Sequence, residues 1–566
     1  MRQILAGNGP VFNIGERAES STSALWQWLL ALAGWTTKMD VGQIAVFGGL
    51  LLTGLGFAVA LDGTRRFHRP PGNSTPDPGS DGSRPGRSLL LPAGIVILLA
   101  VPPVWDYATS GLESGLQSCW LATCWWLLVL SRSPLHPRAL AAISAVIGLG
   151  PLVRPELGVV TIMFLIAVLL NSGPSRKGIL LNVCAAGALP LGYEIFRAGY
   201  YGLLVPLPAL AKEASATNWG RGAAYLKDFI EPYWLSVPLV AAGFLVITVA
   251  LFTTRREGTS PARTKDLAVL AAPVVSSLTL AVYAIAVGGD FMHARMLLPP
   301  LFLLLLPVLL VPASRVAATF VTVITAWAIV AMSPLRTPFD GGGTTPGIVT
   351  QNIRLFTEWR TQRINPDSAD KWLPGFAWLP VAVDRATSAH EPVLAYGHDD
   401  SVLAPARTDA GARVVIAGGF LGITGAVAPL DFRIADVFGL AYPLDAHFQL
   451  IERGAMPGHE KPIPLVWLFA DYADPAVPPP PGPAADGFTP AAIAAARQAL
   501  QCGELRELHE AVREPMSWNR FLQNLTGSVR RTQLRVHPDP FAAKEQFCGA
   551  AAIPRAPGSS VPGFQR

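Results

Sequence analysis

Residues 287–300 read V-G-G-D-F-M-H-A-R-M-L-L-P-P and join two long apolar runs of the chain. An acid, a histidine and an arginine (Asp290, His293 and Arg295) therefore lie at the edge of an apolar layer. Ionisable groups in such a place are costly unless they face protein or water, so by default they indicate a functional site. The alternative interpretation is a polar turn that only joins two membrane spans.

The composition around this stretch indicates a membrane protein. The 566 residues are 51% hydrophobic and only 15% charged, with a mean hydropathy of +0.38. This is too apolar for a soluble enzyme, and repeated apolar runs near bilayer length predict a polytopic α-helical membrane protein. The net charge of +5 is mild. Because the arginines cluster in short loops, they indicate membrane topology, and no nucleic-acid partner is expected.

The apolar runs predict a transmembrane bundle over residues 43–333, with about ten spans of bilayer length. We place them at about 43–61, 89–105, 112–130, 139–153, 157–170, 179–196, 234–251, 267–287, 296–311 and 316–332. The shorter apolar stretch 24–35 carries three tryptophans. Because tryptophan favours the membrane interface, we expect an interfacial helix there, within an extracytoplasmic segment 1–42.

The basic loops set the predicted orientation. When the spans alternate, the loops that carry most of the arginines all fall on one side, which the positive-inside rule makes cytoplasmic. Their residues are Arg65, Arg66, Arg69, Arg84, Arg87, Arg132, Arg138, Arg176, Lys177, Arg255, Arg256, Arg263, Lys265 and Arg315. The stretch 68–87 is rich in Ser, Pro, Gly and Asp, so we expect it to be a disordered cytoplasmic loop. The charged motifs and everything after Ser333 then face outward from the plasma membrane.

This orientation has a consequence at the N-terminus. The first predicted span runs inward, so the chain starts outside, although a polar segment does not cross a membrane unaided. We therefore expect a further span to precede Met1.

Residues 334–566 are predicted to form a soluble extracytoplasmic α/β domain. Residues 413–420 and 431–438 alternate like strands, and 490–501 reads as a helix with proline in its first turn. A proline-rich linker is expected at 476–487. In an oxidising compartment Cys502 and Cys548 are expected to form a disulfide, the alternative being two free thiols. No Cys/His spacing typical of a metal site occurs, so none is predicted.

Two outward-facing motifs contain charges next to apolar spans. In the turn D-Y-A-T-S-G-L-E, residues 106–113, Glu113 begins the next helix. It is either a partner of the helix dipole or a group that binds a sugar or orients a catalytic residue. In V-R-P-E, residues 153–156, Arg154 either forms a structural ion pair or grips a phosphate with its planar fork of donors.

The outward loop 197–233 combines cations with aromatic rings. Its cations are Arg197, Lys212 and Arg221, and its aromatic residues include Tyr200, Tyr201, Trp219 and Tyr233. This combination suits an anionic lipid headgroup and the face of a sugar, and the alternative is an aromatic belt at the membrane interface. In the opening stretch, Asp290 is suited to act as a general base on an acceptor hydroxyl.

Several stretches together resemble a known family. They are residues 7–26 (G-N-G-P-V-F-N-I-G-E-R-A-E-S-S-T-S-A-L-W), 108–116 (A-T-S-G-L-E-S-G-L), 152–156 (L-V-R-P-E), 196–206 (F-R-A-G-Y-Y-G-L-L-V-P), 209–214 (A-L-A-K-E-A), 288–295 (G-G-D-F-M-H-A-R) and 457–461 (P-G-H-E-K). With them the chain resembles GT-C glycosyltransferases that use polyprenyl-phosphate sugars. More closely, it is similar to the AftB-like terminal β-(1→2)-arabinofuranosyltransferases of the actinobacterial cell wall.

The resemblance implies a GT-C-like bundle, a decaprenyl-phosphoryl arabinofuranose donor and an arabinan acceptor in arabinogalactan or lipoarabinomannan. No cofactor is expected, because the phosphate of the donor already activates the sugar. The family also carries an acidic motif ahead of the segment that starts at Gly7. That motif would lie in the additional span expected before Met1.

The resemblance and the motifs together predict three groups of site residues. The catalytic residues are Asp290 and Glu113; the donor phosphate is bound by Arg154, Arg295, His293, Lys212 and Arg197; the sugar or acceptor is bound by Glu16, Asp106, Tyr200, Tyr201 and Trp219. One alternative is a non-catalytic membrane protein that binds glycans or polyprenyl lipids, and another is a different polyprenyl-phosphate-linked sugar transferase. A transporter is disfavoured, because the centres of the spans are nearly free of charge.

Overall fold

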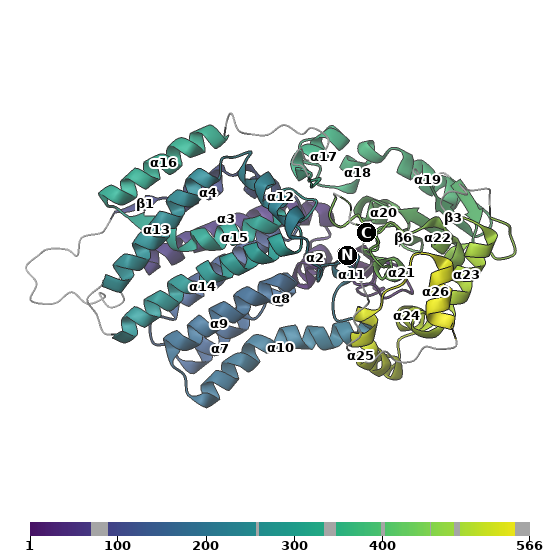
Figure 1. Ribbon diagram of the computed structural model, residues 1–566, viewed down its shortest axis with the longest axis horizontal. Coiled ribbons are helices and arrows are strands. Elements are labelled where there is room, and N and C mark those ends of the chain that lie inside the picture. The colour runs from purple at the N-terminus through teal and green to yellow at the C-terminus, as the bar shows by residue number, and fades with distance from the viewer. Residues whose placement is uncertain are drawn as a thin grey trace, which may run out of the picture.

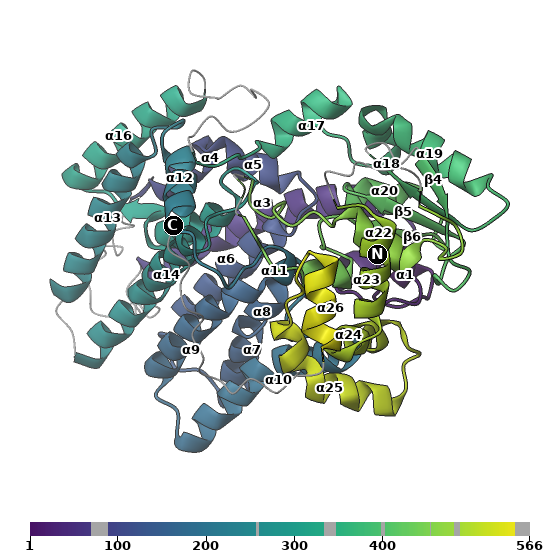
Figure 2. The ribbon, with the colours of Figure 1, turned by 45° about the vertical axis from the view of Figure 1, so that its right-hand side comes forward.

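The computed structural model describes residues 1–68, 89–255, 260–332, 347–397, 402–452, 454, 456–479 and 487–549. Three predicted features lie wholly or partly outside this part of the chain: residues 69–87 of the predicted cytoplasmic loop, Arg256, and residues 480–486 of the predicted linker. Figure 1 shows a bundle of long helices on one side and a mixed assembly of short helices and strands on the other. Figure 2 shows the same division after a turn of 45°.

Within the described residues, six helical segments are long and apolar enough to cross a membrane, which confirms a polytopic membrane protein. They are formed by α3 (Val41–Phe67), η1 (Pro155–Leu157) with α9 (Gly158–Ser172), α10 (Arg176–Tyr200), α13 (Ser236–Arg255), α14 (Ser260–Ala286) and α16 (Arg315–Met332). Each coincides with one of the predicted spans.

The other four predicted spans are shorter or interrupted. They correspond to α6 (Ser114–Leu130), to α7 (Pro137–Ile147) with α8 (Gly150–Val153), to α15 (Leu298–Leu305) between η2 (Arg295–Leu297) and η3 (Leu306–Val308), and to α4 (Gly94–Ala100) with α5 (Pro102–Ala108). The break between α4 and α5 falls at Val101, which is extended because proline follows it. Before α4, β1 (Leu90–Pro92) pairs antiparallel with β2 (Leu310–Pro312).

Glycines bring α3 and α6 into close contact. A Cβ on Gly115 would lie 2.2 Å from the carbonyl oxygen of Gly49, so α6 tolerates no side chain at this crossing. Small residues allow membrane helices to approach in this way when apolar lipid provides no driving force between them. The crossing holds the first turn of α6 in place, and Glu113 directly precedes that turn.

The chain after residue 346 builds a small mixed sheet in the order β4-β3-β5-β6. Its strands are β3 (Val393–Tyr396), β4 (Val402–Pro405), β5 (Val414–Gly418) and β6 (Arg433–Asp436). β3 is antiparallel to β4 and parallel to β5, which is parallel to β6. β3, β5 and β6 are buried along their whole length, as expected for strands covered on both faces. The two strands predicted from the sequence are thereby confirmed.

Helices surround this sheet. Before it come α17 (Ile353–Thr361), α18 (Ala369–Trp372), η4 (Leu373–Phe376) and α19 (Trp378–Thr387); within and after it come α20 (Leu421–Val427), α21 (Pro443–Ala446), α22 (Leu465–Tyr472), α23 (Pro490–Leu500), α24 (Gly503–Arg513), α25 (Trp518–Gln533) and α26 (Pro540–Cys548). The predicted helix at 490–501 is confirmed as α23, where Thr489 caps the backbone N–H of Ala492. A disulfide joins Cys502 to Cys548 and so ties α24 to α26.

The N-terminal segment connects the two halves. After α1 (Arg2–Leu5), the side chain of Asn13 exchanges hydrogen bonds of 2.9 and 3.0 Å with the backbone of Ile434 in β6. The chain then forms α2 (Ala24–Thr37), in which Trp28 and Trp35 are exposed. Two further short helices, α11 (Leu207–Ala211) and α12 (Trp219–Ile230), lie between α10 and α13.

Asp436, at the end of β6, makes a pH-dependent contribution to stability. Burial raises its pKa from 3.8 to about 6, although the backbone N–H groups of Phe438, Leu440 and Ala441 donate to its carboxylate. The folded state therefore binds this proton more tightly than the unfolded state, and the stability from it is lost as the pH rises from about 4 to above 6, by at most about 3 kcal/mol.

Replacing Asp436 by Asn is expected to flatten this dependence, because the amide stays neutral and its oxygen can still accept the bonds from Leu440 and Ala441. The measurement is the thermal unfolding midpoint of the full chain in detergent between pH 4.5 and 7.5. Identical slopes for the two proteins would contradict the prediction.

Candidate active site

The site forms where the chain leaves α14. Gly288 and Gly289 adopt φ angles of 89° and 74°, which favour glycine. Tyr225 packs so closely that a Cβ on Gly289 would lie 2.3 Å from its ring, and Arg221 donates to the carbonyl of Gly288 at 3.0 Å. This turn directs the next residue, Asp290, towards the neighbouring helices.

Asp290 is a buried carboxylate between two cations. Its side chain lies 3.3 Å from Lys212 Nζ and 3.3 Å from an Nη atom of Arg295. It is 6% exposed, and it also accepts the backbone N–H of Phe291 at 2.9 Å. Burial alone would raise the pKa of Asp290, but Lys212 and Arg295 outweigh it and hold the pKa below its usual value. The group is therefore an anion at neutral pH.

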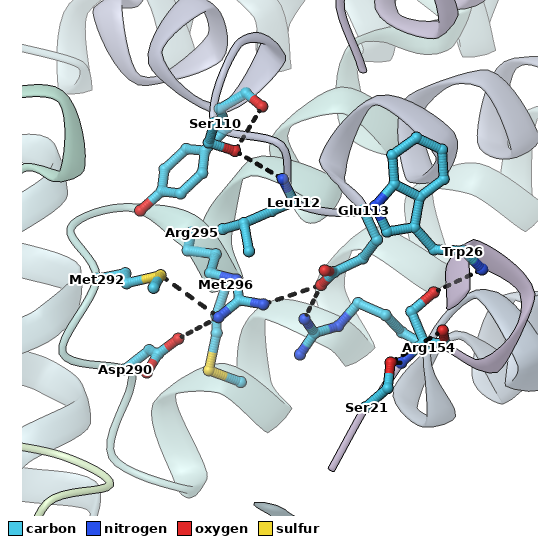
Figure 3. A network of polar contacts seen from close by, with 12 residues as sticks. Ser21, Trp26, Ser110, Leu112, Glu113, Arg154, Asp290, Met292, Arg295 and Met296 are labelled. Atoms are coloured by element: carbon cyan, nitrogen blue, oxygen red, sulfur yellow. Dashed lines mark hydrogen bonds and ion pairs between the residues drawn. The ribbon is translucent and has the colours of Figure 1, made fainter. Parts of the chain in front are cut away.

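Arg295 joins Asp290 to a second carboxylate, as Figure 3 shows. Its other Nη atom donates to Glu113 at 2.9 Å, and Arg154 donates to the same Glu113 oxygen. Arg154 also pairs with Glu156. Glu113 precedes α6 without capping it through its side chain, and it holds the two arginines together. Its catalytic role stays a prediction. Both arginine side chains are only 14% exposed.

Two pockets meet at Arg295. One lies between α6, η1, α14 and α15 and is lined by Arg154, Tyr283 and Met296 among others. The other lies between α3, α5, α6 and α15. Gln117 and Arg295 line both pockets. In the described part of the chain Arg295 Nε is buried and has no hydrogen-bond partner, so this donor is available to a ligand.

Five predicted site residues thus come together in one network. They are Asp290, Glu113, Arg154, Arg295 and Lys212. They come from four separate parts of the sequence and meet at the ends of apolar helices. The three cations meet three carboxylates, because Glu156 at the rim also pairs with Arg154, so an anionic ligand would compete with these carboxylates for the cations.

His293 and Arg197 were also predicted to bind phosphate, but they lie in other contacts. His293 is 8% exposed, with Nδ1 2.7 Å from Asp228 and Nε2 3.1 Å from the Tyr233 hydroxyl. Arg197 forms an ion pair with Glu19 at 2.6 Å. Neither residue contacts the Asp290 network, so their part in binding stays a prediction.

The predicted sugar-binding residues are spread over the molecule. Glu16 is 1% exposed and lies between Arg513, at 2.8 Å, and Arg433, at 3.4 Å. Asp106 is 7% exposed. The structure does not bring either of these carboxylates into contact with Asp290.

The aromatic members of that group differ in accessibility. Tyr201 is 1% exposed and donates to the carbonyl of Pro10 at 2.7 Å, while Tyr200 stacks on Phe196 with 5.0 Å between ring centroids. Trp219, at the start of α12, is 55% exposed. Their role in sugar binding stays a prediction, and Trp219 is the most exposed of the three.

The sequence predictions did not assign a site role to residues 456–461, although P-G-H-E-K was among the resembling stretches. In the structure Lys461 pairs with Glu213 at 2.9 Å, and Glu460 pairs with Arg221. His459 lies between the rings of Phe291 and Phe438, at centroid distances of 4.6 and 4.8 Å. The segment therefore closes over the Lys212 and Asp290 loops. The sequence feature that could have predicted this contact is the opposite charge of Lys461 in this motif and Glu213 in A-L-A-K-E-A.

The guanidinium and ammonium donors at the site suit an anion. Within the described residues, no three His, Cys, Asp or Glu side chains gather closely enough to hold a metal. Each carboxylate of the network is already neutralised by arginine or lysine.

Comparisons with known proteins show which family the chain belongs to. Residues 407–546 match the model of the AftB family C-terminal domain. A terminal beta-(1->2)-arabinofuranosyltransferase of Mycobacterium tuberculosis (strain ATCC 25618 / H37Rv) is 34% identical over 595 residues, covering 95% of this chain and 91% of the relative. The enzyme of the same name from Corynebacterium glutamicum is 34% identical over 578 residues, covering 93% and 80%. No solved structure matches the chain. The chain belongs to the terminal β-(1→2)-arabinofuranosyltransferase family of glycosyltransferases.

Proposed function

We propose that this chain transfers arabinofuranose from decaprenyl-phosphoryl arabinofuranose to cell-wall arabinan on the outer face of the plasma membrane. One observation carries the proposal. Lys212, Arg295 and Arg154 gather around the carboxylates of Asp290, Glu113 and Glu156, where two pockets open between apolar helices. A lipid-linked sugar phosphate needs both parts of this arrangement, a cationic group for its phosphate and an apolar path for its tail.

The donor phosphate is placed at Arg295. This guanidinium has a free Nε donor and faces both pockets, and a planar fork of donors suits phosphate oxygens. Arg154 and Lys212 supply further positive charge on either side. The polyprenyl tail would leave along the pocket between α14 and α15, in a bundle of GT-C type.

The reaction is a single exchange of bonds at C1 of the arabinofuranose. A hydroxyl oxygen of the acceptor forms the new bond to C1, and the bond from C1 to the phosphate oxygen breaks. The electron pair of that bond leaves with decaprenyl phosphate, where the arginines neutralise it. The proton of the hydroxyl passes to Asp290.

Asp290 gains basicity when the donor binds. In the free protein two cations hold its pKa low, which makes it a weak base. A phosphate at Arg295 competes for that guanidinium and adds a negative charge nearby. Both effects raise the pKa of Asp290, so the carboxylate becomes a better proton acceptor only when the donor is in place.

Several features support an outward site and an acceptor path beside the C-terminal domain. The basic loops place the opposite ends of the spans in the cytoplasm by the positive-inside rule. The segment 456–461 contacts the Lys212 loop, so a glycan that reaches Asp290 passes this domain. Trp219 is suited to stack on a sugar of the acceptor, because its ring is exposed.

A donor panel tests the proposal. The full chain, reconstituted in lipid vesicles, would be given polyprenyl-phosphate arabinofuranose, ribofuranose or mannose together with a synthetic oligoarabinofuranoside. We expect transfer of arabinofuranose with kcat/KM at least about 100-fold above that for the other sugars, because hydroxyl-binding sites discriminate strongly. Preferential transfer of another sugar would place the chain among other polyprenyl-phosphate-linked transferases. Donor binding without any transfer would support a non-catalytic binding protein instead.

A further inference from the structure

The helix α25 buries polar residues and exposes several large apolar ones. Its buried residues are Asn524, Ser528 and Arg531. Arg531 donates to the carbonyl of Gly202 at 3.0 Å, and Asn524 donates to the carbonyl of Ala511 at 3.0 Å. A surface helix of a soluble domain normally does the reverse, with its apolar stripe facing the core.

The exposed side of α25 is an apolar stripe. Trp518 is 74% exposed, Leu522 40% and Val529 53%. These positions, with Leu525 between them, follow one another at spacings of four, three and four residues, so they lie on one face of the helix. Contiguous exposed apolar side chains of this size mark an interaction surface.

The apolar stripe continues the apolar surface of a membrane helix. α25 packs against the end of α10, where Phe521 lies so close to Gly199 that a Cβ there would meet its ring at 2.2 Å. The Trp518 ring stacks on Phe521 with 5.6 Å between centroids. α10 itself exposes Leu191 and Ile195 to its surroundings. In Figures 1 and 2 α25 lies beside this end of α10.

We propose that the apolar stripe of α25 (Trp518, Leu522, Leu525 and Val529) rests in the membrane interface and anchors the C-terminal domain to the lipid. Lipid is the occupant because the exposed side chains of α10, a membrane-spanning candidate, lead directly to the stripe. Tryptophan at one end suits the headgroup level, and Arg530 flanks the stripe on its exposed side. The anchor fixes how this domain sits over the Asp290 site.

Site-directed spin labelling of the full chain tests the anchor. A background with Cys119, Cys124 and Cys184 replaced by alanine retains the Cys502–Cys548 disulfide. Nitroxides are then placed at Leu522→Cys and Val529→Cys on the stripe, and at Gln523→Cys as the matched control on the exposed polar side of the same helix. The protein is reconstituted in nanodiscs of phosphatidylcholine and phosphatidylglycerol, and the accessibility of each label to oxygen and to a water-soluble nickel chelate is measured.

We expect the ratio of oxygen to nickel accessibility to be several-fold higher at 522 and 529 than at 523, because oxygen concentrates in the acyl region. Nickel accessibility at 522 equal to that at 523 would overturn the proposal, since the stripe would then face water. Low accessibility to both reagents, with spin–spin broadening on full labelling, would also overturn it and assign the stripe to a second copy of the chain. None of these outcomes depends on which sugar the chain transfers.

Discussion

Replacing Asp290 by Asn is expected to lower kcat for arabinofuranosyl transfer by about 100- to 10,000-fold, the range typical of a lost general base. The amide cannot accept the hydroxyl proton, yet it keeps the size of the side chain and one oxygen near Lys212 and Arg295. Donor affinity should change little or increase, because a negative charge next to the phosphate is lost. Single-turnover rates and donor KM, measured in vesicles, separate these effects.

The control is Asp62→Asn. Asp62 also forms ion pairs with two arginines, Arg65 and Arg66, but it lies near the far end of α3, outside the site. Its replacement should leave the rate within about twofold of the original, as for a surface ion pair. If Asp290→Asn retained full activity in protein that remains folded, Asp290 would not be the base.

Replacing Arg295 by Lys is expected to lower kcat/KM for the donor by about 100- to 1,000-fold, as for the loss of a donor that stabilises the leaving charge. Lysine keeps the positive charge. However, a single ammonium group cannot replace a guanidinium that donates to Asp290 and Glu113 at once and still has its Nε–H available for the donor phosphate. Because both carboxylates lose their fixed partner, the pH profile should also shift, with the acid limb moving to higher pH.

Arg407→Lys is the matched control for this substitution. Arg407 makes a bidentate contact with Asp409 on the exposed surface, outside the network. Replacing Arg407 by lysine removes a bidentate guanidinium contact but leaves the Asp290 network intact, so kcat/KM for the donor should not change. Wild-type kcat/KM for Arg295→Lys would show that the donor phosphate lies elsewhere, and Arg154→Lys would then be examined.

The sequence was a good guide where the determining property is local. The six long spans follow from apolar runs, β5 and β6 follow from alternation, and α23 follows from proline in its first turn. Asp290 and Arg295 could be predicted because they interrupt apolar sequence. The predicted span 89–105 forms β1, α4 and α5 instead of one continuous helix. Hydropathy did not predict this interruption, because it does not record the missing N–H of proline.

The sequence was a poor guide to which charged residues meet. Glu16 is a carboxylate like Glu113, and His293 was predicted to bind phosphate like Lys212. In the structure Glu16 pairs with Arg513 and His293 with Asp228 instead. Residues 456–461 lie more than 160 positions from Asp290 in sequence yet close over it, as the ring of His459 against Phe291 shows. No local pattern states these partners.

By itself, then, the sequence determined the membrane class, most spans, the central strands and the resemblance to arabinofuranosyltransferases, because burial in lipid depends on the summed hydropathy of neighbouring residues. The tertiary structure alone decided the site. The tight glycine crossing of α3 and α6 sets the position of Glu113, and the turn at Gly288 and Gly289 sets that of Asp290. The energy of a charge pair depends on a separation of a few ångströms, which only the packing of distant helices determines.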